Sequence, residues 1–129
     1  MNVLARVLLW LSGLGYVAFG VAFLVAPLRS MALAGIEIQG AIAATELRAF
    51  YGGLELALGG LIVAAALAPG RLRDGLLLTL ASYGAIGATR LVTMLATGTD
   101  APFLRFAVGV ELGLAACAGA LLWATRTPG

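Results

Sequence analysis

Several ionisable side chains, Glu46 among them, lie in stretches that are otherwise apolar enough to cross a lipid bilayer, and four of these side chains are candidates for a functional site. Arg48 and Glu55 share one stretch, Arg90 lies in the next and Glu111 in the last. An ionisable group at membrane depth costs at least about 2.5 kcal/mol, so such groups face the interior of a bundle, pair with one another and mark a candidate functional site. Because the guanidinium fork of arginine can engage two carboxylates, we expect Arg90 to bridge Glu55 and Glu111. Arg48 then lies nearer the mouth of the bundle.

The elements that must position these side chains are four apolar stretches, each close to the roughly 20 residues that a membrane-spanning helix needs. They cover residues 4–26, 45–68, 75–96 and 102–123, and turn-forming Pro and Gly residues separate them. The chain is 62% hydrophobic and only 11% charged, so lipid must serve as its solvent. We predict an all-α polytopic membrane protein, a four-helix bundle forming one domain over residues 1–129, with residues 127–129 as a short free tail.

The depth of each charge follows from a helical rise of about 1.5 Å per residue. Counted from the outer surface, Arg48 lies roughly 5 Å deep, Tyr51 roughly 9 Å and Glu55 roughly 15 Å. Arg90 comes to roughly 9 Å and Glu111 to roughly 13 Å on their own spans. Three spans therefore deliver ionisable groups to one layer in the outer half of the membrane.

Helical periodicity predicts which faces meet. Small or apolar residues flank each charge at i, i+4 and i+7 spacing, and the stripe in the second span is Arg48, Gly52, Glu55, Gly59 and Ile62. Tyr51 lies beside this stripe, and Tyr83 shares a face with Arg90, so both phenols can donate to the charged network. The network has a purely structural alternative, an ion-pair cluster that fixes helix register.

Two further faces consist of small residues, which allow close approach of helix backbones in membranes. They are Gly53, Ala57 and Gly60 in the second span, and Gly109 and Gly113 in the fourth. Packing within the monomer and a homo-oligomer interface are both consistent with such faces.

The distribution of arginine predicts the orientation. The side with both termini and the 69–74 loop holds Arg6, Arg71, Arg73 and Arg126, against Arg29, Arg105 and the nearby Arg48 on the other side. Positive residues favour the cytoplasm, so we expect both termini there. The connection over residues 27–44 is long and apolar, and we expect a short helix in the outer interface, either a lid over the bundle or a simple connector.

Composition excludes several classes of function. The chain has no histidine and one cysteine, Cys117, in an apolar run, which argues against histidine-ligated metals, haem and a disulfide within the chain. No nucleotide or zinc motif occurs, so we expect no metal and no cofactor. The scattered arginines argue against nucleic-acid binding. The first apolar run is too long for the core of a cleaved signal peptide, so we read it as a retained span.

The run ELRAFYGGLELALG, residues 46–59, resembles the signature of a bacterial family of small four-span membrane proteins known as a domain of unknown function. Arg90 in GATRL and Glu111 in GVELGLA match the charges that accompany this motif in the third and fourth spans. The layout is also distantly similar to DoxX-like membrane proteins. The resemblance implies a four-helix bundle in a bacterial inner membrane and assigns no activity.

Three functions remain open at this point. The first is a binding or transport-related module for a small solute or a lipid headgroup, with Arg48 and Arg90 as anchors for an anionic group. The second is a structural or accessory subunit of a membrane complex. The third, which we rank last, is an enzyme acting on a lipid-soluble substrate, with Glu55 or Glu111 as acid or base and Arg90 stabilising charge.

Overall fold

Helices account for nearly all of residues 1–126, which are the residues that the computed structural model describes. The predicted tail, residues 127–129, lies outside them. The elements are α1 (Asn2–Val25), α2 (Pro27–Leu33), α3 (Ala41–Leu47), the π-helical segment η1 (Arg48–Leu54), α4 (Glu55–Leu67), α5 (Leu72–Thr97) and α6 (Pro102–Ala124). Because α3, η1 and α4 follow one another without a break, residues 1–126 contain four helices long and apolar enough to cross a membrane. No strand occurs among these residues.

Proline and glycine mark the helix boundaries. Pro27 is the first residue of α2 and Pro102 the first residue of α6. Proline suits this position because the first N–H group of a helix has no hydrogen-bond partner within the helix. Gly98 ends α5 with a φ of 68°, a left-handed conformation that favours glycine. The second long helix begins at Ala41, four residues before the predicted start, and α5 begins at Leu72 rather than Gly75. A helix can extend beyond its apolar stretch because its backbone bonds do not depend on hydropathy.

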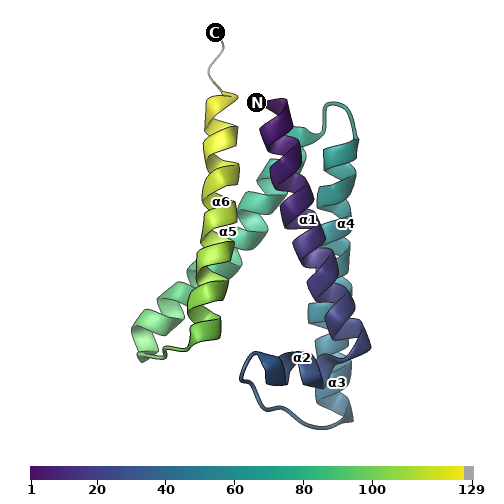
Figure 1. Ribbon diagram of the computed structural model, residues 1–129, viewed down its shortest axis with the longest axis vertical. Coiled ribbons are helices and arrows are strands. Elements are labelled where there is room, and N and C mark those ends of the chain that lie inside the picture. The colour runs from purple at the N-terminus through teal and green to yellow at the C-terminus, as the bar shows by residue number, and fades with distance from the viewer. Residues whose placement is uncertain (127–129) are drawn as a thin grey trace.

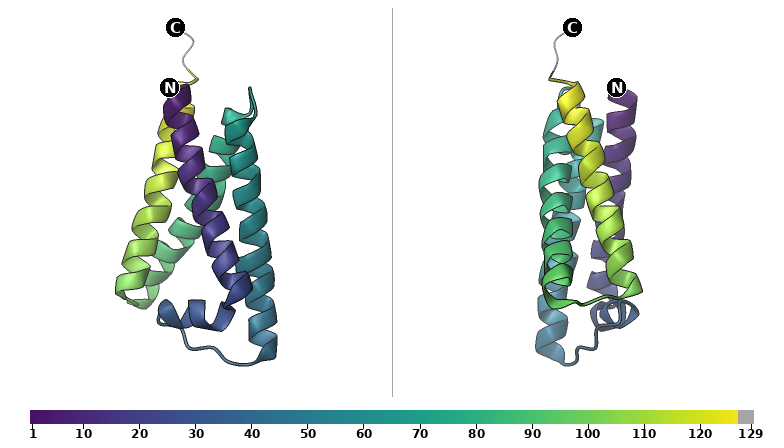
Figure 2. Two further views of the ribbon diagram at one scale, coloured as in Figure 1. Left: turned by 45° about the vertical axis from the view of Figure 1, so that its right-hand side comes forward. Right: turned by 90° about the vertical axis from the view of Figure 1, so that its left-hand side faces the viewer.

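The long helices form two pairs that diverge from one end of the bundle (Figure 1). One pair is α1 with α4 and the other is α5 with α6, and the start of α1 lies at the same end of the bundle as the end of α6, where the pairs converge. The main core fills this converging end, with Leu9, Ile62, Leu76 and Ala118 almost fully buried. At the opposite end the pairs separate, and α2 lies across the long axis there, as the turned views in Figure 2 also show.

Glycines set the close packing between α1 and the antiparallel long helix formed by η1 and α4. A Cβ atom on Gly59 would lie 2.7 Å from the Gly13 carbonyl oxygen, and one on Gly20 would lie 2.9 Å from the Gly52 carbonyl oxygen. Each helix thus presents two glycines seven residues apart to its partner, so the backbones approach as they do in membrane helix pairs. Gly52 and Gly59, which the sequence places in one stripe with Arg48 and Glu55, therefore pack against α1.

The small-residue faces predicted for close packing point elsewhere. A Cβ atom on Gly60, Gly109 or Gly113 would meet nothing within 4 Å, and one on Gly53 would meet only its own helix. Ala57 is exposed as well. Packing within the monomer therefore does not account for these two faces.

The short helix predicted between the first two spans is present as α2. Its Met31 packs against Phe23 of α1 and Leu47 of α3 in a small separate core. None of the described residues between positions 26 and 44 lines the cavity described below. This arrangement favours a simple connector, which holds α1 and α3 together, and does not favour a lid on the bundle.

Candidate functional site

A cavity of about 570 Å³ lies between the two helix pairs, where they diverge. Glu55 contributes from the start of α4, Arg90 from α5 and Glu111 from α6, so the three charges meet as predicted in one place. Tyr51 and Tyr83 line the same space. Most of the remaining wall is aromatic or aliphatic, and its aromatic rings come from Tyr16, Phe19, Phe50, Phe103 and Phe106.

An ion pair spans α5 and α6 on one wall of this cavity. Arg90 donates from Nη2 to Oε1 of Glu111 at 2.9 Å and from Nε to Oε2 at 3.1 Å. The two side chains are only 27% and 13% exposed. Two parallel hydrogen bonds of this kind are charge-assisted and fix the orientation of both partners. Phe103 supports the guanidinium, which lies 6.0 Å from the ring centroid.

Glu55 takes no part in that ion pair. No hydrogen bond or salt bridge involves its carboxylate among residues 1–126, although Arg90 and Glu111 lie within electrostatic range. The predicted bridge by Arg90 is therefore confirmed for Glu111 and wrong for Glu55. The reason is that α5 and α6 pack together along their length, whereas Glu55 belongs to α4, which pairs with α1. Glu55 is left as a carboxylate that faces the cavity without a partner.

Arg48 lies outside the cavity, contrary to prediction. Its Nε donates to the Leu24 carbonyl oxygen at 3.0 Å, in the last turn of α1, where carbonyls lack partners within the helix. The cause is the π-helical segment over Arg48–Leu54. A π turn closes i→i+5 bonds and so takes about one more residue than an α turn, which is roughly 100° of rotation. Arg48 and Glu55 would share a face on an unbroken α-helix, and this segment turns them apart.

The same segment turns two aromatic side chains toward the cavity. Phe50 and Tyr51 both line it, and the Tyr51 ring lies 5.1 Å from that of Phe23 and 6.4 Å from that of Phe19. Short π-helical segments within α-helices are frequent at functional sites. Tyr51 thus belongs to an aromatic wall, and no hydrogen bond joins its hydroxyl to the charged residues in the described structure.

Tyr83 also differs from its predicted role. Its hydroxyl donates to the Ser12 carbonyl oxygen at 2.6 Å, and its ring stacks on Tyr16 with centroids 4.3 Å apart. Tyr83 therefore ties α5 to α1 at the inner end of the cavity and does not donate to the carboxylates. The Tyr16 hydroxyl is buried and makes no hydrogen bond within residues 1–126.

A second hollow of about 510 Å³ adjoins the first. Ile86 and Arg90 line both spaces, while Thr89, Thr93 and Thr99 give the second one a partly polar wall near the α5–α6 turn. Arg90 therefore borders both hollows, whereas its partner Glu111 borders the first.

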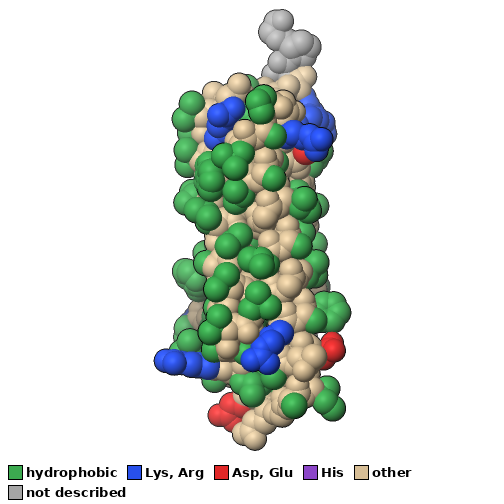
Figure 3. Space-filling model, turned by 90° about the vertical axis from the view of Figure 1, so that its right-hand side faces the viewer, with side chains coloured by type: hydrophobic (Ala, Val, Ile, Leu, Met, Phe, Trp, Pro, Cys, Tyr) green, Lys and Arg blue, Asp and Glu red, His purple; other side chains and the backbone are tan. Residues whose placement is uncertain are grey.

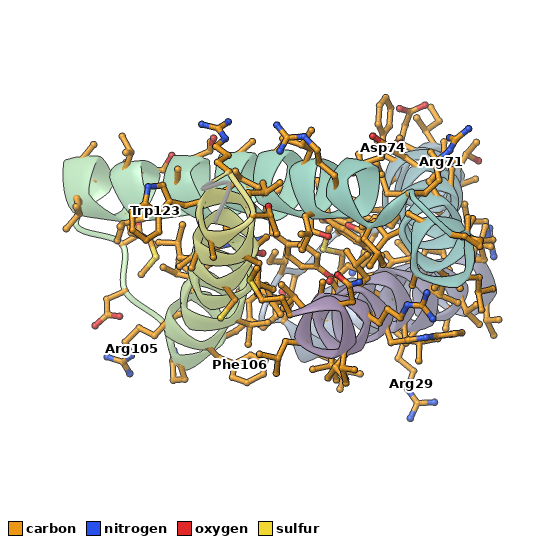
Figure 4. All side chains as sticks on the ribbon, turned by 90° about the horizontal axis from the view of Figure 1, so that it is seen from above. Arg29, Arg71, Asp74, Arg105, Phe106 and Trp123 are labelled. Atoms are coloured by element: carbon orange, nitrogen blue, oxygen red, sulfur yellow. The ribbon has the colours of Figure 1, made fainter. Side chains whose placement is uncertain are left out.

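Sequence reasoning missed most of the aromatic wall. Phe103 and Phe106, three residues apart at the start of α6, carried the helical spacing that could have revealed it. Figure 4 shows Phe106 on the side of α6 that faces away from α5. Phe50 could not be placed because its direction depends on the π-helical segment.

Comparison with known proteins identifies the family and no more. Residues 4–123 match the family described as a domain of unknown function, DUF4345. The chain belongs to this family. No curated protein matches the chain, and neither does any solved structure.

Proposed function

We propose that this protein crosses the inner membrane of a bacterium four times, with both termini in the cytoplasm, and that its cavity binds a small solute or a lipid headgroup. Figure 3 supports insertion into a membrane, because on the face that it shows, charged side chains gather near the two ends and a largely apolar band lies between them. Arg29 and Arg105 point away from the bundle (Figure 4), and the segments that carry them, α2 and the start of α6, lie at the end opposite the N-terminus (Figure 1). The end with the termini and the 69–74 loop carries more arginines than the opposite end. This excess favours a cytoplasmic location for the end with the termini.

The observation that carries the proposal is an unpartnered carboxylate, Glu55, facing a cavity that is otherwise walled by aromatic rings and one ion pair. The volume of about 570 Å³ falls within the range of roughly 300–1,000 Å³ typical of small-molecule sites. A mostly apolar wall with a few convergent polar groups is the usual composition of such sites. A charge held at membrane depth without a partner is costly unless a ligand or water meets it.

The roles within the site differ from those expected from the sequence. Arg48 binds the end of α1 and is not part of the proposed site. Arg90 keeps its Nη1 group free of hydrogen bonds in the described structure, so it can contact a ligand while it holds Glu111. The adjoining threonine-lined hollow lies near the α5–α6 turn and shares Arg90 with the first cavity.

The test is retention of a ligand by purified protein. Val110→Trp should fill the cavity that Val110 lines, whereas Val92→Trp makes the same change on an exposed face that lines neither hollow. We expect mass spectrometry of protein in lipid nanodiscs to find a molecule bound to wild type and to Val92→Trp but absent from Val110→Trp. Identical bound molecules in all three preparations would count against a ligand site.

Orientation has its own test. Single cysteines at Thr125 and at Thr99, in a Cys117→Ala background, should differ in labelling by a membrane-impermeant maleimide in spheroplasts. We expect labelling at position 99, in the α5–α6 turn, and none at position 125 until the membrane is opened. The reverse pattern would invert the proposed orientation.

A second candidate, a subunit of a homo-oligomer or larger complex, has one specific observation in its favour. The faces formed by Gly53, Ala57 and Gly60 and by Gly109 and Gly113 are exposed and unpacked, as helix-association faces are before assembly. Native mass spectrometry should then find wild type in a defined assembly that Gly60→Leu or Gly109→Leu breaks. A monomer in every case would remove this candidate.

A further inference from the structure

We infer that the ligand of this cavity is an organic cation, an ammonium group carried on an apolar body. The inference rests on the proposed function and narrows it from any small solute or headgroup to one class. Two observations support it: the unpaired carboxylate of Glu55 faces the cavity, and aromatic rings form much of the cavity wall.

The charge balance of the site favours a cation. Two carboxylates, Glu55 and Glu111, and one guanidinium, Arg90, line the cavity. Arg90 and Glu111 satisfy one another through two hydrogen bonds, so one carboxylate remains in excess. An anionic ligand would have to share Arg90 with Glu111 and lie in the field of Glu55. A cationic group beside Glu55 would give that carboxylate the partner that no protein group supplies.

The walls favour the same ligand. Phe19, Phe50, Tyr51 and Phe106 surround the space, and the face of an aromatic ring attracts a cation. Phe103 already has a cation near it, the guanidinium of Arg90. Quaternary and alkylated ammonium groups are recognised by rings grouped in this way. Phe50 and Phe106 are also strongly exposed at the rim, so an apolar body can extend past them toward the surrounding lipid.

Two sources could supply this chemistry, an aminophospholipid such as phosphatidylethanolamine or a soluble organic amine. The test uses nanodiscs of phosphatidylglycerol, which has no ammonium group, and three probes built on one benzyl scaffold. Benzyltrimethylammonium carries the cation, neopentylbenzene is its neutral isostere, and benzylsulfonate carries an anion. Binding is measured by calorimetry and corrected with empty nanodiscs.

The variants separate charge from shape. We expect wild type to bind benzyltrimethylammonium and Glu55→Gln to bind it at least about tenfold more weakly, because the substitution removes the unpaired carboxylate and leaves the cation only the aromatic rings. Glu55→Asp, which keeps the carboxylate, should retain most of the preference for the cation over neopentylbenzene. Adding phosphatidylethanolamine to the nanodiscs should weaken probe binding if the natural source is a lipid, and leave it unchanged if the source is a soluble amine.

Several results would overturn the inference. Equal binding of the cation by wild type and Glu55→Gln would do so, as would preferential binding of benzylsulfonate or no cation binding at all. If Val110→Trp still abolishes binding of the sulfonate, of neopentylbenzene or of a retained native molecule, the cavity is a ligand site of another class and only the inference fails. If nothing is lost in Val110→Trp, the proposed function fails with it.

Discussion

Replacing Glu111 by Gln should lower the stability of the protein, whereas replacing Glu55 by Gln should not. Glu111 accepts two hydrogen bonds from Arg90 at 2.9 and 3.1 Å, and its side chain is 13% exposed. Glu55 accepts none from any residue of the described structure. Glu111→Gln therefore removes a partner and leaves the Arg90 guanidinium held by an amide, whereas Glu55→Gln removes a charge that no residue compensates.

The magnitude follows from how the pair is held. Removing one partner of a buried ion pair destabilises by about 3–5 kcal/mol, and we expect the lower end for Glu111→Gln because Arg90 is 27% exposed and borders the cavity. Glu55→Gln should leave stability unchanged or raise it, since the neutral amide is cheaper to hold at this depth. Replacing both members of the ion pair, in Arg90→Met with Glu111→Leu, should recover much of the loss because no lone charge remains.

The assay is thermal unfolding of each variant in one detergent, followed by intrinsic tryptophan fluorescence and by helical circular dichroism. Wild type and Val92→Trp are the references. The reasoning would be refuted if Glu55→Gln melted at the same lowered temperature as Glu111→Gln, because Glu55 would then have a protein partner as strong as Arg90.

Two further predictions concern residues away from the charges. Gly59→Ala should destabilise the protein by about 1–3 kcal/mol, because the new Cβ atom would lie 2.7 Å from the Gly13 carbonyl oxygen. Its control is Gly60→Ala at the next position, where a Cβ atom meets nothing within 4 Å, and this variant should be neutral or slightly stabilising in the same melting assay. Arg48→Met should lose the hydrogen bond to the Leu24 carbonyl and about 1.5–3 kcal/mol of stability with it. Its binding of benzyltrimethylammonium, measured by calorimetry, should stay within about twofold of wild type, a difference of about 0.4 kcal/mol in binding free energy. A loss of binding in Arg48→Met without unfolding would place Arg48 in the site after all.

Composition and periodicity were sufficient to predict the helices. Uninterrupted apolar length predicted four long helices, and Pro and Gly predicted their breaks, because these signals act locally along the chain. The meeting of Glu55, Arg90 and Glu111 was also predictable, since equal depth on antiparallel helices brings side chains to one level.

The details of the site were not predictable because they depend on local geometry. The stripe through Arg48 and Glu55 assumed a constant 3.6 residues per turn, and the π-helical segment between them breaks that assumption. Nothing in the residues of this segment marks it as π-helical rather than α-helical. A Cβ atom on Gly52 or Gly59 would meet α1, whereas one on Gly53 or Gly60 would meet no other helix.

The choice of partner for Arg90 was equally undetermined. Two carboxylates lay at similar predicted depth, and periodicity gives no preference between Glu55 and Glu111. The structure pairs Arg90 with Glu111 because α5 and α6 pack together along their length, whereas α4 belongs to the other helix pair. The unpaired carboxylate, from which the proposed function follows, is thus a consequence of how the helices pair.

The central claim, that the cavity between the helix pairs holds a small ligand in the native membrane, can be tested most directly by photocrosslinking in intact cells. A benzophenone amino acid would replace Phe106, at the cavity rim, or Trp123, which is equally exposed at 70% and lines neither hollow. The account predicts that position 106 captures a small molecule that position 123 does not, in addition to the bulk phospholipid that both contact, and that Glu55→Gln diminishes this adduct. The same adducts at both positions, or only a protein partner at position 106, would contradict it.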